Sequence, residues 1–191
     1  MTVALDILAA RARLYRAYPT ATSVAYVRDN DLDMRQLADA AGCFTVMRVA
    51  VSGDRFEFSE TGNTIVAIVE AFGRDGATVL DLVAWPLTDP GQILTMFGRA
   101  PMLGTVNIFD ATSYTFGRPL NCRRTPLGWW RAGCQGIVVI DPAAAARLLL
   151  DAPGAISGED FDHSREIGEL VRSLFDPARF VAPVSDERRA A

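Results

Sequence analysis

The chain has 191 residues, of which 50% are hydrophobic, so it can bury a core without disulfides or metals, and this composition excludes an intrinsically disordered protein. All 19 basic residues are arginine, and with 23 acidic residues they give a net charge of −4, so a cationic surface can only be local. Three cysteines without CxxC spacing argue against a disulfide framework and indicate a reducing, cytoplasmic compartment. No apolar run approaches the length that spans a membrane.

Helical patterns dominate the start of the chain. Apolar residues at helical spacing predict a helix that ends before Pro19. Residues 24–27 are expected to form a short strand. Asp33 and Gln36 match a capping box, and Gly42 is placed for a C-terminal stop, so a second helix is predicted between them.

From Phe44 onward the pattern becomes alternating, and branched and aromatic residues become frequent, which is typical of strands. Four strands are predicted, over residues 44–51, 55–59, 64–72 and 78–85. The turns between them are too short for parallel crossovers. This half of the chain therefore predicts an antiparallel meander and argues against a doubly wound nucleotide-binding fold.

The second half is expected to begin with a short helix after Asp89 and a strand or hairpin over residues 105–116. Proline and glycine residues predict that residues 118–131 form a surface loop, because they disfavour a long helix or a central strand. The apolar run 137–140 is typical of a strand buried on both faces, and Asp141 is placed to cap a helix after it.

These elements together predict one α+β domain over residues 1–183. Its antiparallel β-meander is flanked by helices, and a C-terminal β-α unit and a terminal helix follow. The terminal helix is expected to open near Asp160. Residues 184–191 are polar and are predicted to form a disordered tail.

The candidate site is the Arg/Trp segment, residues 118–131. No acidic residue occurs from residue 111 to residue 140, so this window carries a charge of +4. The predicted ligand-binding residues are Arg118, Arg123, Arg124, Trp129, Trp130 and Arg131. Guanidinium groups bind phosphates in bidentate fashion and tryptophan faces stack on bases, so the segment predicts a non-catalytic binding protein for an anionic partner, with nucleic acid preferred to other phosphate-bearing ligands.

Three other interpretations of the Arg/Trp segment stay open. The tryptophans can be core anchors, the arginines can pair with acids of the same chain, or the segment can be a contact between copies in a homo-oligomer. Each leaves the segment without a nucleic-acid ligand.

An enzyme is the rival interpretation, with Glu70, Asp81 or Asp110 as its carboxylates. Glu70 and Asp81 lie in neighbouring predicted strands, but alternation also explains them as polar residues of a solvated face. No serine or cysteine nucleophile motif and no Walker or GxGxxG pattern occurs. The sequence predicts no cofactor and no metal site, since the three cysteines and His163 lack short-spaced ligand pairs.

Overall fold

The structure is a computed structural model that describes residues 2–17 and 20–175, with side chains described from residue 6 onward. The predicted tail at residues 184–191 lies outside the described residues. No helix within the described ranges is both long and apolar enough to cross a membrane.

Three helices open the chain: α1 (Thr2–Arg16), α2 (Ala21–Asp29) and α3 (Met34–Ala41). The strand predicted at residues 24–27 is wrong, because a capping box starts a helix there instead: Thr20 and Ser23 each accept a hydrogen bond from the other's backbone N–H. Asp33 caps α3 as predicted, by accepting from the backbone N–H of Arg35.

The predicted strands are present, but they close into a barrel rather than forming a simple meander. The strands are β1 (Thr45–Ser52), β2 (Arg55–Phe58), β3 (Thr64–Phe72), β4 (Val79–Pro86) and β5 (Leu94–Thr95). Their order around the barrel is β1-β2-β5-β4-β3, so β1 pairs with both β2 and β3 and the predicted neighbourhood of β2 and β3 is wrong. The short strand β5, where a helix was expected after Asp89, closes the barrel by pairing parallel to β2 and antiparallel to β4.

Alternation along β3 and β4 divides the core into two clusters. Val66, Ile68 and Leu82 belong to a cluster that includes Leu14 of α1, and they fill one side of these strands. Residues of the opposite parity, such as Val69 and Trp85, pack with α2, α3 and the second half of the chain. Both faces of β3 and β4 are therefore buried.

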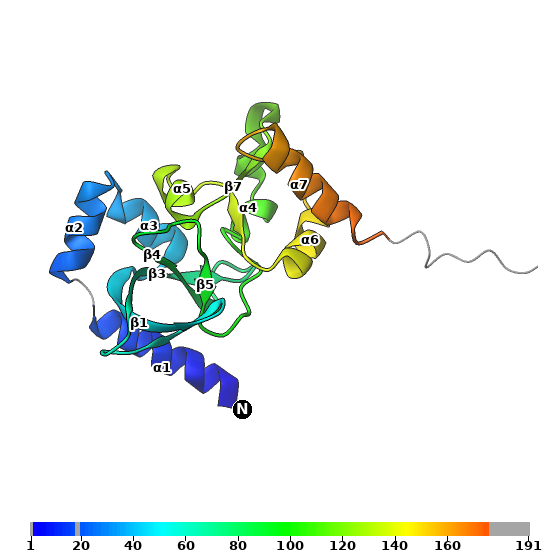
Figure 1. Ribbon diagram of the computed structural model, residues 1–191. Coiled ribbons are helices and arrows are strands. Elements are labelled where there is room, and N and C mark those ends of the chain that lie inside the picture. The colour runs from blue at the N-terminus through cyan, green and yellow to red at the C-terminus, as the bar shows by residue number, and fades with distance from the viewer. Residues whose placement is uncertain (1, 18–19, 176–191) are drawn as a thin grey trace, which may run out of the picture.

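The second half forms a smaller mixed sheet with the order β6-β8-β7-β9, covered by short helices (Figure 1). Its strands are β6 (Met102–Leu103), β7 (Leu120–Arg123), β8 (Ile137–Val139) and β9 (Ile156–Ser157). Its helices are α4 (Val106–Phe109), the 3-10 helix η1 (Ala111–Gly117), α5 (Pro126–Arg131), α6 (Pro142–Leu150) and α7 (Phe161–Arg172). The predicted β-α unit after residue 137 and the terminal helix are both confirmed, as is the α+β class.

Two predictions for this half are wrong. Residues 105–116 supply α4 and most of η1 instead of a strand or hairpin, and Asp110 caps η1 by accepting from the backbone N–H of Thr112; Thr115 and Phe116 depart from helical backbone angles. The segment 118–131 is not a loop, since it supplies β7 in the interior of the small sheet and the helix α5. Thr125 caps α5 and Pro126 occupies its first turn, so the proline starts a helix instead of preventing one.

Candidate functional site

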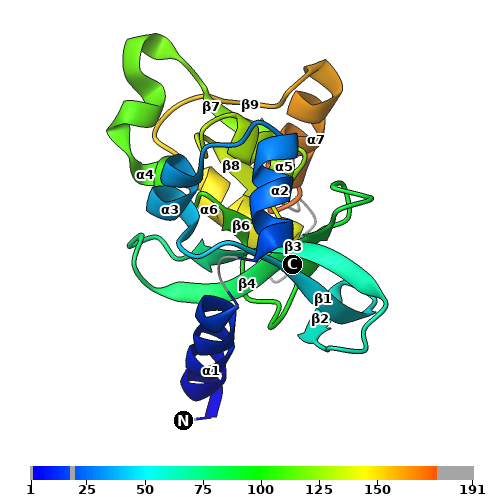
Figure 2. The same cartoon turned by 90° about the vertical axis from the view of Figure 1, so that its left-hand side faces the viewer.

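A polar pocket with a volume of about 660 Å³ lies between α3, η1 and the loop before β8. A pocket of this size is within the range that small-molecule sites occupy. Figure 2 shows α3 beside the α4 and η1 segment, which rises at one side of the small sheet. The polar side chains that line the pocket come from four separate segments: Gln36, Asp39, Asn107, Asp110, Thr112, Ser113, Thr115, Arg118, Asn121 and Gln135.

One wall of the pocket is a tight loop held by backbone geometry. Gly133, Cys134 and Gly136 all have positive φ, at 71°, 58° and 83°. A Cβ added at Gly136 would overlap the carbonyl oxygen of Asn121, so the close approach of this loop to β7 requires glycine there. The amide of Asn107 then fixes the loop, because its Nδ2 donates to the carbonyl oxygens of Cys134 (3.1 Å) and Gly136 (2.7 Å).

The two tryptophans of the Arg/Trp segment are buried beneath the pocket and hold its walls by hydrogen bonds. Trp129 and Trp130 are each 1% exposed. Trp129 donates its indole N–H to the carbonyl of Gly136, and Trp130 donates to the carbonyl of Asp33 at the start of α3. The Trp130 ring also packs edge-on against Phe44 at 4.6 Å between centroids. In this conformation no base can stack on either ring.

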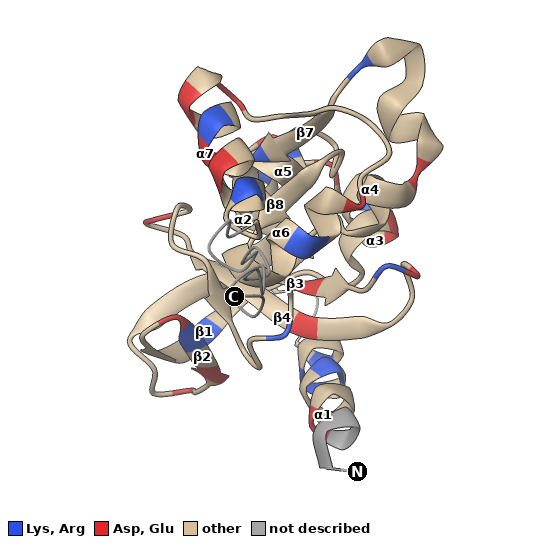
Figure 3. Ribbon diagram, turned by 90° about the vertical axis from the view of Figure 1, so that its right-hand side faces the viewer, with Lys and Arg blue, Asp and Glu red and all other residues tan. Residues whose placement is uncertain are grey.

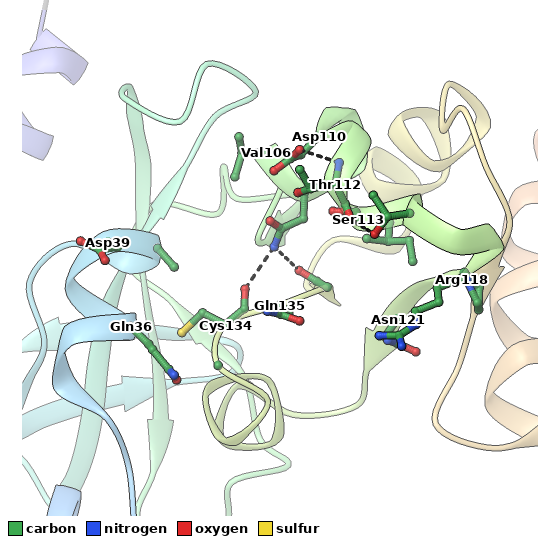
Figure 4. A pocket seen from close by; sticks show the side chains of 17 residues that line it. Gln36, Asp39, Val106, Asp110, Thr112, Ser113, Arg118, Asn121, Cys134 and Gln135 are labelled. Atoms are coloured by element: carbon green, nitrogen blue, oxygen red, sulfur yellow. Dashed lines mark hydrogen bonds between the residues drawn. The ribbon is translucent and has the colours of Figure 1, made fainter.

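Arg118 is the one arginine of the Arg/Trp segment that lines the pocket. Its side chain is exposed and makes no hydrogen bond or ion pair with the described residues. Figure 4 shows Arg118 and Asn121 on one side of the pocket, with Asp39 and Gln36 on the opposite side and Asp110 beside η1. The backbone N–H of Thr112 donates to Asp110 and lowers the pKa of that carboxyl, so Asp110 is ionised at neutral pH. The pocket is therefore bipolar, with the Arg118 cation across from Asp39 and the Asp110 carboxylate beside η1.

Two other arginines of the segment face acids in α7 and just before its start. Arg124 pairs with Glu166 (3.0 Å) and Asp160 (3.3 Å), and Arg123 lies 3.7 Å from Glu159. Figure 3 shows basic and acidic residues side by side in this part of the molecule. These contacts match the interpretation in which the chain's own acids neutralise the arginines, so Arg123 and Arg124 hold α7 on the small sheet.

The last of the predicted site residues, Arg131, is exposed at the end of α5 and donates to the side-chain oxygen of Asn30 (2.9 Å). The structure thus places Arg118 alone of the six in the pocket. Whether any of the six contacts a ligand stays a prediction.

The strand carboxylates of the enzyme interpretation do not converge. Glu70 pairs across the sheet with Leu82 and Asp81 pairs with Ala71, so Glu70 and Asp81 point to opposite faces. Glu70 accepts from Arg11 and Tyr15 of α1, and Asp81 accepts only backbone N–H groups. Hydrogen bonds within the fold therefore explain both buried carboxylates without a catalytic role.

Metal-binding and thiol chemistry find no support in the described residues. No group of three or more His, Cys, Asp or Glu side chains within them is placed to hold a metal ion. Burial raises the pKa of Cys43 and Cys122 to about 11 and of Cys134 to about 12, so the three thiols are protonated at neutral pH.

His163 gives the fold a specific pH dependence. It is 6% exposed, and its Nδ1 accepts from the backbone N–H of Glu159. Burial, followed by the nearby charge of Arg124, lowers the pKa of His163 below its ordinary value of 6.5, although the neighbouring acids Glu159, Asp160 and Glu166 oppose the shift. The folded protein therefore resists protonation of this imidazole.

We expect the free energy of unfolding to decrease as the pH falls below 6.5, because the unfolded chain binds the proton first. One proton limits the slope to about 1.4 kcal/mol per pH unit. Urea unfolding between pH 7 and pH 5 measures it. The variant His163→Asn keeps an acceptor for Glu159 and should lose this dependence, since the chain has no other histidine. An equal slope in both proteins would contradict the assignment.

Sequence reasoning missed most of the pocket residues. Gln36 is predicted only as a capping-box residue, Asp39 has no predicted role beyond its place in the same helix, and Asn107 falls in a segment predicted to be a strand or hairpin. The sequence signal of an unusual loop is the pair of glycines, Gly133 and Gly136, on either side of Cys134. All three residues have positive φ in the structure. The chain matches no protein-family model, no curated protein and no solved structure.

Proposed function

We propose that this protein is a non-catalytic binding protein for single-stranded nucleic acid, and that one nucleotide of the strand enters the polar pocket. The observation that carries the proposal is the bipolar lining, with Arg118 on one side, Asp39 on the opposite side and Asp110 beside η1. A nucleotide has the complementary polarity, because its phosphate is anionic while its sugar hydroxyls and base amino groups are hydrogen-bond donors.

Arg118 supplies the phosphate contact in this arrangement. It is exposed, and within the described residues it has no carboxylate partner that a phosphate would have to displace. Arg124, by contrast, has two acidic partners. A planar guanidinium forms paired hydrogen bonds with phosphate oxygens, so a free arginine at the pocket edge favours a phosphate over a neutral ligand.

Amide side chains supply the remaining polar contacts. Gln36 and Gln135 line the pocket, are exposed, and make no side-chain hydrogen bond to another described residue. Asn121 uses its Oδ1 to accept from Ser157, which leaves its Nδ2 donor open. Amides offer donors and acceptors together and therefore suit base edges and sugar hydroxyls.

The test is fluorescence anisotropy of labelled single-stranded DNA and RNA, titrated over a series of salt concentrations. Arg118→Ala is expected to weaken binding about tenfold and to reduce the slope of log K against log salt by about 1, as for one lost phosphate contact. Arg147→Ala is the matched control, since Arg147 is exposed on α6 outside the pocket. It should leave affinity unchanged.

Two outcomes would contradict the proposal. One is that the wild-type protein binds no strand at low salt, and the other is that Arg118→Ala binds as tightly as Arg147→Ala. A parallel titration with mononucleotides separates a strand from a free nucleotide, because only a strand adds phosphate contacts outside the pocket. Affinity that is equal for both ligands would assign the pocket to a free nucleotide.

A further inference from the structure

Phe116 is the most exposed large hydrophobic side chain in the part of the chain that the structure describes, at 97%. A fully exposed phenyl ring adds nothing to the core, and burying it against water would be favourable. Its position is therefore not explained by packing within this chain.

The backbone at Phe116 also adopts a disfavoured conformation. Its φ is 58° and its ψ is 26°, in the left-handed region where bulky residues are outliers. Packing of the ring does not offset the cost of this backbone conformation, because the ring is almost fully exposed. Residues held in disfavoured backbone conformations cluster at active sites, ligand clamps and switch regions.

Phe116 lies in the chain between two residues of the polar pocket. Thr115 immediately before it and Arg118 two residues after it both line the pocket. The change of backbone hand between Thr115 and Phe116 turns the ring away from the protein while its neighbours face the pocket. An aromatic face is thus available beside the guanidinium that we assign to a phosphate.

From this placement we infer that Phe116 stacks on a base of the bound strand. The inference rests on the proposed function and adds the chemical feature that is recognised, an unpaired base in addition to a phosphate. Trp129 and Trp130 cannot take this role because both rings are buried. Stacking on an aromatic side chain tolerates any base, so Phe116 adds affinity without sequence preference.

The experiment compares an oligonucleotide with an abasic strand of the same length, which keeps the phosphates and removes the bases. Wild-type protein should bind the oligonucleotide about tenfold more tightly than the abasic strand. Phe116→Asn should reduce this difference to the part that the pocket amides supply and leave abasic binding unchanged. Phe116→Tyr should preserve the difference. Phe161→Ala is the matched control, since Phe161 is an exposed phenylalanine, at 81%, on α7 outside the pocket lining.

Folding does not confound the test. Asparagine tolerates positive φ better than phenylalanine, and no core contact is lost, so Phe116→Asn should unfold at the same or higher urea concentration than the wild type. Equal wild-type affinity for both strands would overturn the stacking inference and leave the phosphate proposal standing. A lack of binding to either strand would overturn both. A change in oligomeric state in Phe116→Asn, with the preference for bases retained, would assign the ring to self-association instead.

Discussion

Asp81→Asn is expected to lower the free energy of unfolding by about 3 kcal/mol. The Asp81 side chain is fully buried and contacts the segment after β5. Its Oδ1 accepts from the backbone N–H groups of Leu82 (2.8 Å), Met96 (3.1 Å) and Phe97 (2.9 Å). Its Oδ2 accepts from that of Arg99 (2.7 Å).

Asparagine has the same shape but replaces one acceptor oxygen with a donor, so it places an N–H group against a backbone N–H. It also removes the negative charge that strengthens the remaining bonds. Urea unfolding measures the loss. Asp89→Asn is the control, because Asp89 is exposed and accepts from one backbone N–H, that of Gly91. A similar small change in both variants would show that Asp81 does not organise the segment 96–99.

Glu70→Gln is expected to cost about 3 kcal/mol and to loosen α1 from the barrel. The Glu70 carboxylate is buried and accepts from Arg11 Nε (2.5 Å), the Tyr15 hydroxyl (3.2 Å) and the backbone N–H of Cys43 (3.1 Å). A Cβ at Gly42 would overlap Glu70 Oε2, so the glycine leaves room for this carboxylate. Removing the charge leaves Arg11 without its anionic partner.

Two measurements follow the effect of Glu70→Gln. Urea unfolding gives the global loss, and hydrogen–deuterium exchange should show faster exchange in α1 than in the wild type. The matched control is Glu57→Gln on β2, where the side chain is exposed and makes no ion pair with a described residue. Unchanged exchange in α1 would contradict the role assigned to Glu70.

The sequence predicted elements best where local patterns dominate. The alternating residues of β1 to β4 and the aspartate caps of α3 and α6 act within a few residues, so they are readable without the fold. Strand order is different, because the position of β1 between β2 and β3 depends on closure by the two-residue strand β5. So short a strand has no pattern of its own.

The Arg/Trp segment shows the limit most clearly. Its charge and aromatic content were visible, but the acids that face Arg124 lie 36 and 42 residues further along the chain. The tryptophans' indole N–H groups find carbonyl acceptors in turns that only the fold creates. Composition therefore identified the region, and tertiary contacts decided that Arg118, alone of the segment's four arginines, lines the pocket.

The most direct test of the account is a nuclear magnetic resonance titration of the isotopically labelled protein with a short single strand. The side-chain amide signals of Gln36, Asn121 and Gln135 and the Nε–H signal of Arg118 are expected to shift together as the strand is added. Those of the buried Trp129 and Trp130 indoles should move little, because both rings lie behind the pocket wall. Shifts confined to Arg123, Arg124 and α7, with the pocket amides unchanged, would contradict the proposed site.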